Sequence, residues 1–511
     1  RRNESDPRRR EELAGIAARC RQVPEHPARS FAEALQSVWF IQLILQLESN
    51  GHSISLGRFD QYMYPYFRGD IDSGVTELES AEELLHCFYL KLSELDKVRD
   101  KVSSVAFGGS PMFQHLSVGG QDRAGMSAVN DLSYLCLDAA AKVGLTQPSI
   151  SIRWYYGSPD RFLRHAVKVA SCGLGMPAFF NDEVLIPNML QLGHTIEDAR
   201  DYSIVGCTET SVPGISEPWL TGGFINLPKI LELAVLNGED ILTGRRSSFQ
   251  TGDPKDFPSF DAFLQGYFDQ ISHYLREQVR CDNILDSLHG MLLPTVFESV
   301  LVDSCMERGM TTLQGGARFN STTINAVGIA NVADSLIAIK ELVYENSTVR
   351  WQQIQDIVRN NFDGEEVLRA RIVNSLPKYG NDVDDVDSLA AAVHEHIHRE
   401  IQKYRTPRGG PYLNALYSIS SHILFADKVG ASLDGRLEGE VIADGGVSCA
   451  QGRDLDGPTA LLNSVVRLDP FKAVGSTLLN LKFHPNVFST PQGVSGVENL
   501  LKTFFLKKGQ H

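Results

Sequence analysis

Short runs rich in β-branched and aromatic residues alternate with longer stretches in which apolar residues recur at helical spacing. The helical pattern is clearest at residues 30–47, 81–95, 161–174, 260–278, 331–343 and 388–404. The short runs lie at residues 149–154, 178–181, 202–207 and 477–483. Strands separated by helices pair in parallel through crossover connections. The sequence therefore predicts an α/β fold, a barrel or an open sheet, and a single domain because no long linker interrupts the chain.

Charge and composition narrow the classes of partner. The chain has 511 residues, and 48 Lys and Arg against 63 Asp and Glu give a net charge of −15. This balance argues against nucleic acid or an anionic membrane as the main partner and favours a small-molecule substrate. No apolar run approaches the ~18 residues that cross a bilayer, and the amino end has no signal-peptide core. We therefore expect a soluble, cytoplasmic chain.

Metal-binding patterns are weak. Eight cysteines are scattered without a CxxC pair, so no disulfide framework and no cysteine-rich zinc or iron–sulfur site is predicted. Residues 394–398 satisfy HExxH, which on a helix places His394 and His398 one turn apart with Glu395 as a general base. The residues that follow supply no third ligand. We expect no bound metal, and a zinc hydrolase on His394 and His398 stays as an alternative.

Cys207 and Glu209 follow a short apolar run, in the sequence Gly-Cys-Thr-Glu. In an extended segment, side chains two residues apart project to the same side, about 7 Å apart. A thiol and a carboxylate so placed can address neighbouring atoms of one small molecule. Taken alone, the pair is also compatible with a buried structural thiol beside a surface charge.

Segments along nearly the whole chain resemble those of the glycyl radical enzymes of the pyruvate formate-lyase family. The first is similar to the family's NGxSxSxGRxDQY pattern and lies at residues 48–62. The others follow in family order at residues 114–120, 178–182, 206–209, 379–382, 429–436, 457–464 and 480–485. Several such matches in order are far more specific than any one of them.

This resemblance implies a ten-stranded α/β barrel surrounded by helices, with the cysteine loop inside, as one catalytic domain over residues 1–511. It implies that Cys207 carries a thiyl radical and that Glu209 is the general base. It also implies no bound cofactor but an organic radical on a glycine, installed by a radical S-adenosylmethionine activase, and a homodimer. A thiyl radical must be protected from water and oxygen, which suits an enclosed site.

The carboxyl end departs from the family pattern, in which an RVxGF or RVxGY motif carries the radical glycine. No Arg-Val-x-Gly occurs in the sequence, which ends at His511. Family chains also extend further at the amino end. We therefore expect a fragment truncated at both ends, in which the glycine radical domain is absent and activity requires the missing segment. An inactive relic is the alternative.

The residues around the cysteine narrow the reaction. Pyruvate formate-lyases carry two adjacent cysteines, whereas Gly206 precedes Cys207 here, as in the eliminases and in arylacetate decarboxylases. We expect a lyase that dehydrates or otherwise eliminates from glycerol, propanediol, hydroxyproline or choline; a decarboxylase or formate acetyltransferase is the alternative. Five residues are candidates for substrate binding, namely His52, Ser53, Phe107, Phe113 and Thr221. His52 as an imidazolium would protonate a departing hydroxyl near pH 7. The faces of Phe107 and Phe113 suit a cation or an apolar ring, and Leu220 together with Thr221 makes the wall less polar than a polyol site requires.

Overall fold

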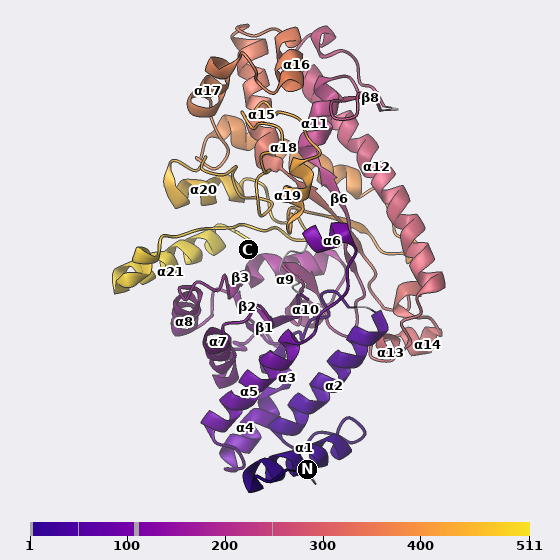
Figure 1. Cartoon of the computed structure of the whole chain (residues 1–511), viewed down its shortest axis with the longest axis vertical. Helices are drawn as coiled ribbons and strands as arrows, with labels where there is room; N and C mark the ends of the chain where they lie inside the picture. Colours follow the sequence, from indigo (N-terminus) through magenta and orange to yellow (C-terminus); the bar gives the residue numbers. More distant parts are fainter. Residues whose placement is uncertain (1–3, 50, 107–111, 248) are drawn as a thin grey trace.

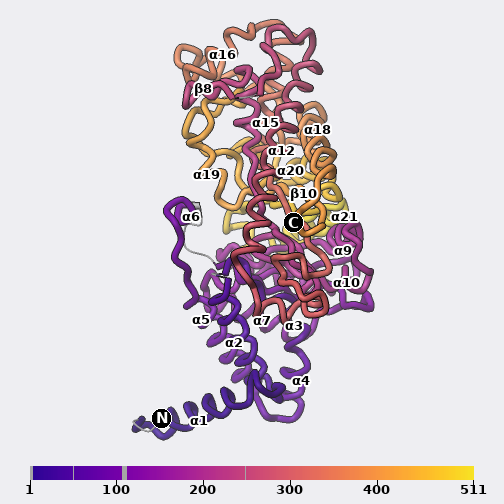
Figure 2. Tube along the Cα trace, turned by 90° about the vertical axis from the view of Figure 1, so that its right-hand side faces the viewer, coloured from indigo at the N-terminus to yellow at the C-terminus, as the bar shows by residue number. Residues whose placement is uncertain are grey.

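The computed structural model describes residues 4–49, 51–106, 112–247 and 249–511. The molecule is elongated, with α1 at one end and α16 and α17 at the other, and the C-terminus lies near the middle in both views (Figures 1 and 2). Within the described ranges, no helix is both long and apolar enough to cross a membrane.

Two parallel three-stranded sheets form the framework. The first has the order β1-β2-β3, with β1 (His115–Gly119), β2 (Ser149–Trp154) and β3 (Ala178–Asn181). The second has the order β10-β9-β6, with β6 (Trp219–Asn226), β9 (Thr322–Val327) and β10 (Tyr412–Ala415). Single parallel bridges extend the sheets, from Gly57 to Leu116 and from Leu416 to Thr477. Every residue of β1 and β9 is buried, as parallel strands covered on both faces require.

Two antiparallel hairpins complete the strands. One joins β4 (Ser203–Val205) to β5 (Glu209–Ser211), and the other joins β7 (Glu239–Asp240) to β8 (Arg245–Arg246). The described strands therefore confirm an α/β fold with parallel sheets, whereas the ten-stranded barrel predicted by the resemblance is not shown by these strand pairings. The run predicted as a strand at residues 477–483 makes only the bridge at Thr477.

Helices cover both sheets (Figure 1). Those in the first part of the chain are α1 (Pro7–Gln22), α2 (Phe31–Ser49), α3 (Phe59–Tyr62), α4 (Tyr64–Asp72), α5 (Leu78–Ser93), α6 (Lys101–Ala106), α7 (Asp131–Val143), α8 (Asp160–Ala170), α9 (Asp182–Gln191) and α10 (Ile196–Arg200). Those in the rest are α11 (Leu227–Val235), α12 (Phe260–Leu292), α13 (Val296–Ser299), α14 (Cys305–Arg308), α15 (Ile329–Ile339), α16 (Trp351–Asn360), α17 (Glu366–Ser375), α18 (Asp384–Ile401), α19 (Ser421–Ala426), α20 (Gly457–Val466) and α21 (Pro491–Leu506). Each of the six predicted helical segments corresponds to one of them.

A buried ion pair ties the first sheet to the β4–β5 hairpin. The Arg153 guanidinium on β2 donates to both carboxylate oxygens of Asp182, each at 2.9 Å, and to the Tyr202 carbonyl oxygen at 2.8 Å. Both side chains are fully buried. A buried pair of this kind holds its partners in one geometry because loss of either leaves an uncompensated charge. It therefore fixes where the hairpin leaves the sheet.

Candidate active site

The loop that carries Cys207 connects β4 to β5. Gly206 has φ +66°, and a Cβ there would come within 2.8 Å of the Ser53 hydroxyl oxygen, so the turn requires glycine. The Gly206 carbonyl oxygen is 2.9 Å from His115 Nδ1, and the Thr208 carbonyl oxygen accepts a 2.7 Å bond from the Ser476 hydroxyl. Groups distant in sequence therefore hold both sides of the loop, and Ser53 lies directly beside it.

The Glu209 carboxylate folds back under the cysteine. One oxygen, Oε2, accepts from the backbone N–H groups of Cys207 at 2.9 Å and Thr208 at 2.8 Å. The other, Oε1, accepts from the Tyr417 hydroxyl at 2.9 Å and the Thr221 hydroxyl at 3.2 Å. Burial raises the pKa of Glu209 above its ordinary value, against the lowering effect of these bonds. A carboxylate with a raised pKa is well matched to a general base.

Tyr417 gives Glu209 a way to hold a proton. Its hydroxyl lies 2.9 Å from Glu209 Oε1 and 2.8 Å from the Leu220 carbonyl oxygen, but a hydroxyl has one hydrogen to donate. When Glu209 is ionised, that hydrogen can point to Oε1. When Glu209 is protonated, the acid can donate to the Tyr417 oxygen while Tyr417 donates to Leu220. Both protonation states are therefore satisfied without movement of heavy atoms.

Cys207 lines a cavity of about 690 Å³. The cavity is bounded mainly by the end of α8, the segment after Thr477, α21 and His511, and it is largely apolar. Cys207 itself is half-buried. Burial, and then the Glu209 charge, raise the pKa of the thiol well above its ordinary value. Cys207 is therefore a neutral S–H at pH 7, which suits hydrogen-atom transfer and opposes nucleophilic or metal-binding chemistry that needs the thiolate.

The predicted substrate residues are only partly brought together. Thr221 contacts Glu209, and Ser53 adjoins the cysteine loop. The His52 ring meets the Phe113 ring edge-on with centroids 5.2 Å apart, so one side of the imidazole is covered although the residue keeps contact with solvent. Desolvation and the nearby Arg99 guanidinium lower the pKa of His52 to about 4, which favours a neutral imidazole near pH 7. Phe107 lies outside the described residues.

The alternative zinc site has the geometry of ordinary helix packing. His394 Nδ1 contacts the Leu468 carbonyl oxygen, and His398 Nδ1 lies 3.0 Å from the Lys472 carbonyl oxygen. Glu395 pairs with Arg399 and Lys472. Across the part of the chain that the structure describes, no group of three or more His, Cys, Asp or Glu side chains could hold a metal ion.

Two known protein families match this chain. A family described as "Pyruvate formate lyase-like" matches residues 1–426, and one described as "Glycine radical" matches residues 443–511. The chain belongs to the pyruvate formate lyase-like glycyl radical enzymes. The second match does not support the prediction that the glycine radical domain is absent, although Arg-Val-x-Gly does not occur in the sequence.

Several relatives are similar over nearly the whole chain. The "Probable dehydratase YbiW" of Escherichia coli K12 is 39% identical over 522 residues, which cover 98% of this chain and 64% of the relative. A solved structure described as "1,2-propanediol Dehydration in Roseburia inulinivorans" is 43% identical in sequence, with a TM-score of 0.96, and the match covers 100% of this chain and 65% of that one. The glycerol-bound, B12-independent glycerol dehydratase from Clostridium butyricum is 41% identical, also with a TM-score of 0.96, and covers 100% and 64%. This chain thus spans about two thirds of their length.

Replacing Tyr417 with phenylalanine tests its role as a positioning residue. If Glu209 is the general base that the sequence predicts, it acts only when ionised, so kcat/KM should fall as the pH drops through its pKa. Loss of the Tyr417 bond removes an interaction that lowers this pKa. We expect Tyr417→Phe to move the acid limb of the kcat/KM profile to higher pH and to lower kcat by about tenfold. Tyr412→Phe, whose hydroxyl bonds Asn283 instead, is the matched control; identical profiles for the two variants would refute the role.

Proposed function

We propose that this chain carries the thiyl-radical site of a glycyl radical dehydratase that eliminates water from a small vicinal diol or a related hydroxylated substrate. The observation that carries the proposal is the pairing of a neutral thiol at Cys207 with the raised-pKa carboxyl of Glu209. The similarity of this chain to solved structures described by 1,2-propanediol dehydration and as a glycerol dehydratase supports the substrate class.

The chemistry divides between the two side chains. A glycyl radical would supply the unpaired electron to Cys207. The Cys207 sulfur then takes a hydrogen atom from the hydroxyl-bearing carbon, and Glu209 takes the proton of that hydroxyl. The neighbouring hydroxyl leaves as water with a proton returned by Glu209, and the resulting carbon radical recovers a hydrogen atom from the Cys207 thiol. The sum is a diol converted to an aldehyde and water, with Cys207 and Glu209 restored.

Ser53 and Thr221 are the side chains best placed to orient the substrate, because one adjoins the cysteine loop and the other contacts Glu209. We assign His52 and Phe113 to the same wall, with His52 as a neutral hydrogen-bonding group. Acetyl transfer is disfavoured since Gly206 occupies the position of a second cysteine.

The wider arrangement is part of the proposal. We infer that the two parallel sheets, each extended by a bridged segment, belong to a ten-stranded barrel and that residues 1–511 act as one catalytic unit. On the basis of family membership, we also propose activation by a radical S-adenosylmethionine activase, assembly as a homodimer and a cytoplasmic location.

A product assay tests the reaction class. The full-length protein, activated anaerobically, is given 1,2-propanediol, glycerol or trans-4-hydroxyproline, and separately an arylacetate. We expect loss of water from at least one hydroxylated substrate, detected as the carbonyl product, and no carbon dioxide from the arylacetate. Carbon dioxide release without dehydration would replace the proposal with a decarboxylase.

A further inference from the structure

A second cavity is separate from the one that Cys207 lines, since the two share no lining residue. Its volume is about 280 Å³, which suits a small ligand. Thr210 and Ser211 of β5 contribute to its wall. Because these residues directly follow Glu209, the cavity adjoins the strand that carries the proposed base.

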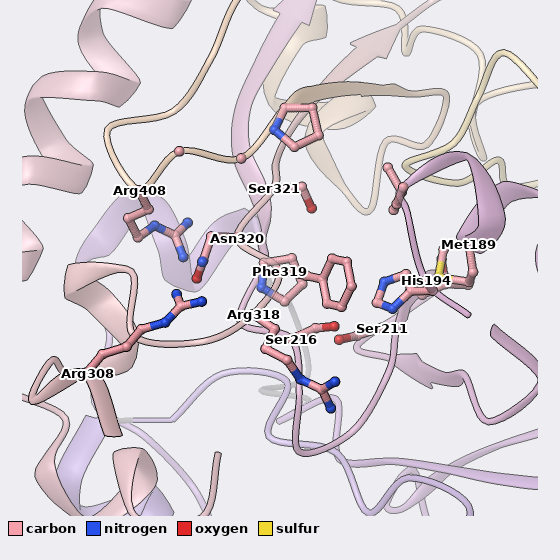
Figure 3. Close-up of a pocket in the computed structure, with 16 residues that line it drawn as sticks. Met189, His194, Ser211, Ser216, Arg308, Arg318, Phe319, Asn320, Ser321 and Arg408 are labelled. Carbon is pink, nitrogen blue, oxygen red and sulfur yellow. The ribbon is translucent and has the colours of Figure 1, made fainter. Parts of the chain in front are cut away.

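The wall is rich in positive charge. Three arginines, Arg308, Arg318 and Arg408, line the cavity, and its lining includes no aspartate or glutamate. Figure 3 shows Arg308 and Arg408 pointing toward one another beside Asn320. They come from α14 and from the turn before β10, segments far apart in the sequence. The fold therefore brings together arginine side chains that lie far apart in the sequence.

Two of the three guanidinium charges are balanced. Arg408 pairs with Asp286 at 2.9 Å, and Arg318 pairs with Asp303 at 3.2 Å. Arg308 donates to the backbone carbonyl oxygens of Gly315 and Ala317. Glu217 accepts from Arg408 through its backbone carbonyl oxygen, and burial and Glu298 raise the pKa of its carboxyl well above the ordinary value. Arg308, in contrast, forms no ion pair with a carboxylate within the residues that the structure describes, and its guanidinium contacts backbone carbonyl oxygens instead.

Buried polar atoms on the wall lack partners. They are Arg408 Nη2, Asn320 Oδ1, Ser216 Oγ and His194 Nδ1. The Arg408 side chain is only 3% exposed, so this orphan donor is held within the protein. Each unsatisfied buried polar group costs roughly 1–3 kcal/mol. A ligand with several acceptor oxygens would satisfy the donors from Arg408 and Ser216 together with the unpaired charge of Arg308.

We propose that this cavity binds a small free oxyanion of the phosphate, sulfate or carboxylate class. Arg408 and Ser216 donate to its oxygens, and Arg308 supplies the balancing charge. The bound anion contacts the wall formed by Thr210 and Ser211, so its occupancy steadies β5 and with it the position of Glu209.

Titration calorimetry of the full-length protein with inorganic phosphate, sulfate and acetate, at ionic strength held constant with chloride, tests this site. We expect saturable one-to-one binding of at least one of them, weakened about tenfold or more in Arg308→Gln and measurably weakened in Ser216→Ala. Arg280→Gln is the matched control, since Arg280 is exposed on α12 and pairs with Glu277. Amide hydrogen exchange over residues 209–218 should slow on binding in the wild type and in Arg280→Gln.

Two outcomes would overturn the proposal. One is the absence of saturable binding for all three anions, as expected if water or an acidic side chain from elsewhere in the protein fills the cavity. The other is binding that neither Arg308→Gln nor Ser216→Ala alters, which would place the anion elsewhere.

Discussion

Replacing Cys207 with alanine should abolish turnover while leaving the glycyl radical formable in the activated protein. Alanine has no hydrogen that can pass between a protein radical and a carbon, whereas the Cys207 thiol lines the cavity in its neutral form. We expect less than about 1% of wild-type turnover, which corresponds to more than ~2.7 kcal/mol of barrier. Electron paramagnetic resonance measures the radical, and product formation measures turnover.

Cys281→Ala is the control for this variant, because Cys281 is an exposed thiol on α12. It should retain full activity and the same radical signal. Turnover of Cys207→Ala above a few per cent of wild type, with an equal radical content, would exclude Cys207 as the relay.

Glu209→Gln should lower the rate by about 10² to 10⁴, the range expected for loss of a general base. The amide can keep the shape of the site: its oxygen can accept from the Cys207 and Thr208 N–H groups, while its NH₂ group faces the Tyr417 and Thr221 hydroxyls, which can accept. Only proton acceptance is lost. Steady-state kinetics with the preferred substrate measures the effect.

The control for this variant is Glu395→Gln. It also distinguishes the proposed dehydratase from the alternative zinc hydrolase. Glu395 is the glutamate of the HExxH pattern and pairs with Lys472, away from Cys207. A zinc hydrolase would lose activity in Glu395→Gln and keep it in Glu209→Gln. The proposed dehydratase shows the opposite pattern, and near-wild-type turnover in Glu209→Gln would make the carboxylate a bystander.

The local sequence pattern predicted those strands and helices whose side chains are buried in a regular pattern. The runs at residues 149–154 and 178–181 coincide with β2 and β3, because their β-branched and aromatic residues favour strands and Ile150, Ile152 and Phe180 are buried in the core. The end of α12 was not predicted: the helix continues to Leu292, beyond the segment 260–278, through exposed leucines that give no clear one-sided pattern. The run at 477–483 has strand-like composition but pairs only at its first residue.

Some residues of the candidate site could likewise be predicted from the sequence, and others could not. Cys207 and Glu209 could be found because two residues of one loop carry the chemistry together. Tyr417 could not, since it lies 208 residues from Glu209 and only the packing of the second sheet against the hairpin brings the two together. The pKa of His52 likewise depends on Arg99, which no local motif places beside it.

Transfer of deuterium within one substrate molecule tests the central claim most directly. The activated wild-type protein is given 1,2-propanediol with two deuterium atoms on C1, in ordinary water. If Cys207 takes a deuterium atom from C1 and returns it to the product radical, the aldehyde should carry one deuterium on C1 and one on C2, since the recessed thiol limits exchange with solvent. A dehydration product with ordinary hydrogen at C2 throughout, its second deuterium released to water, would contradict relay of a hydrogen atom by Cys207.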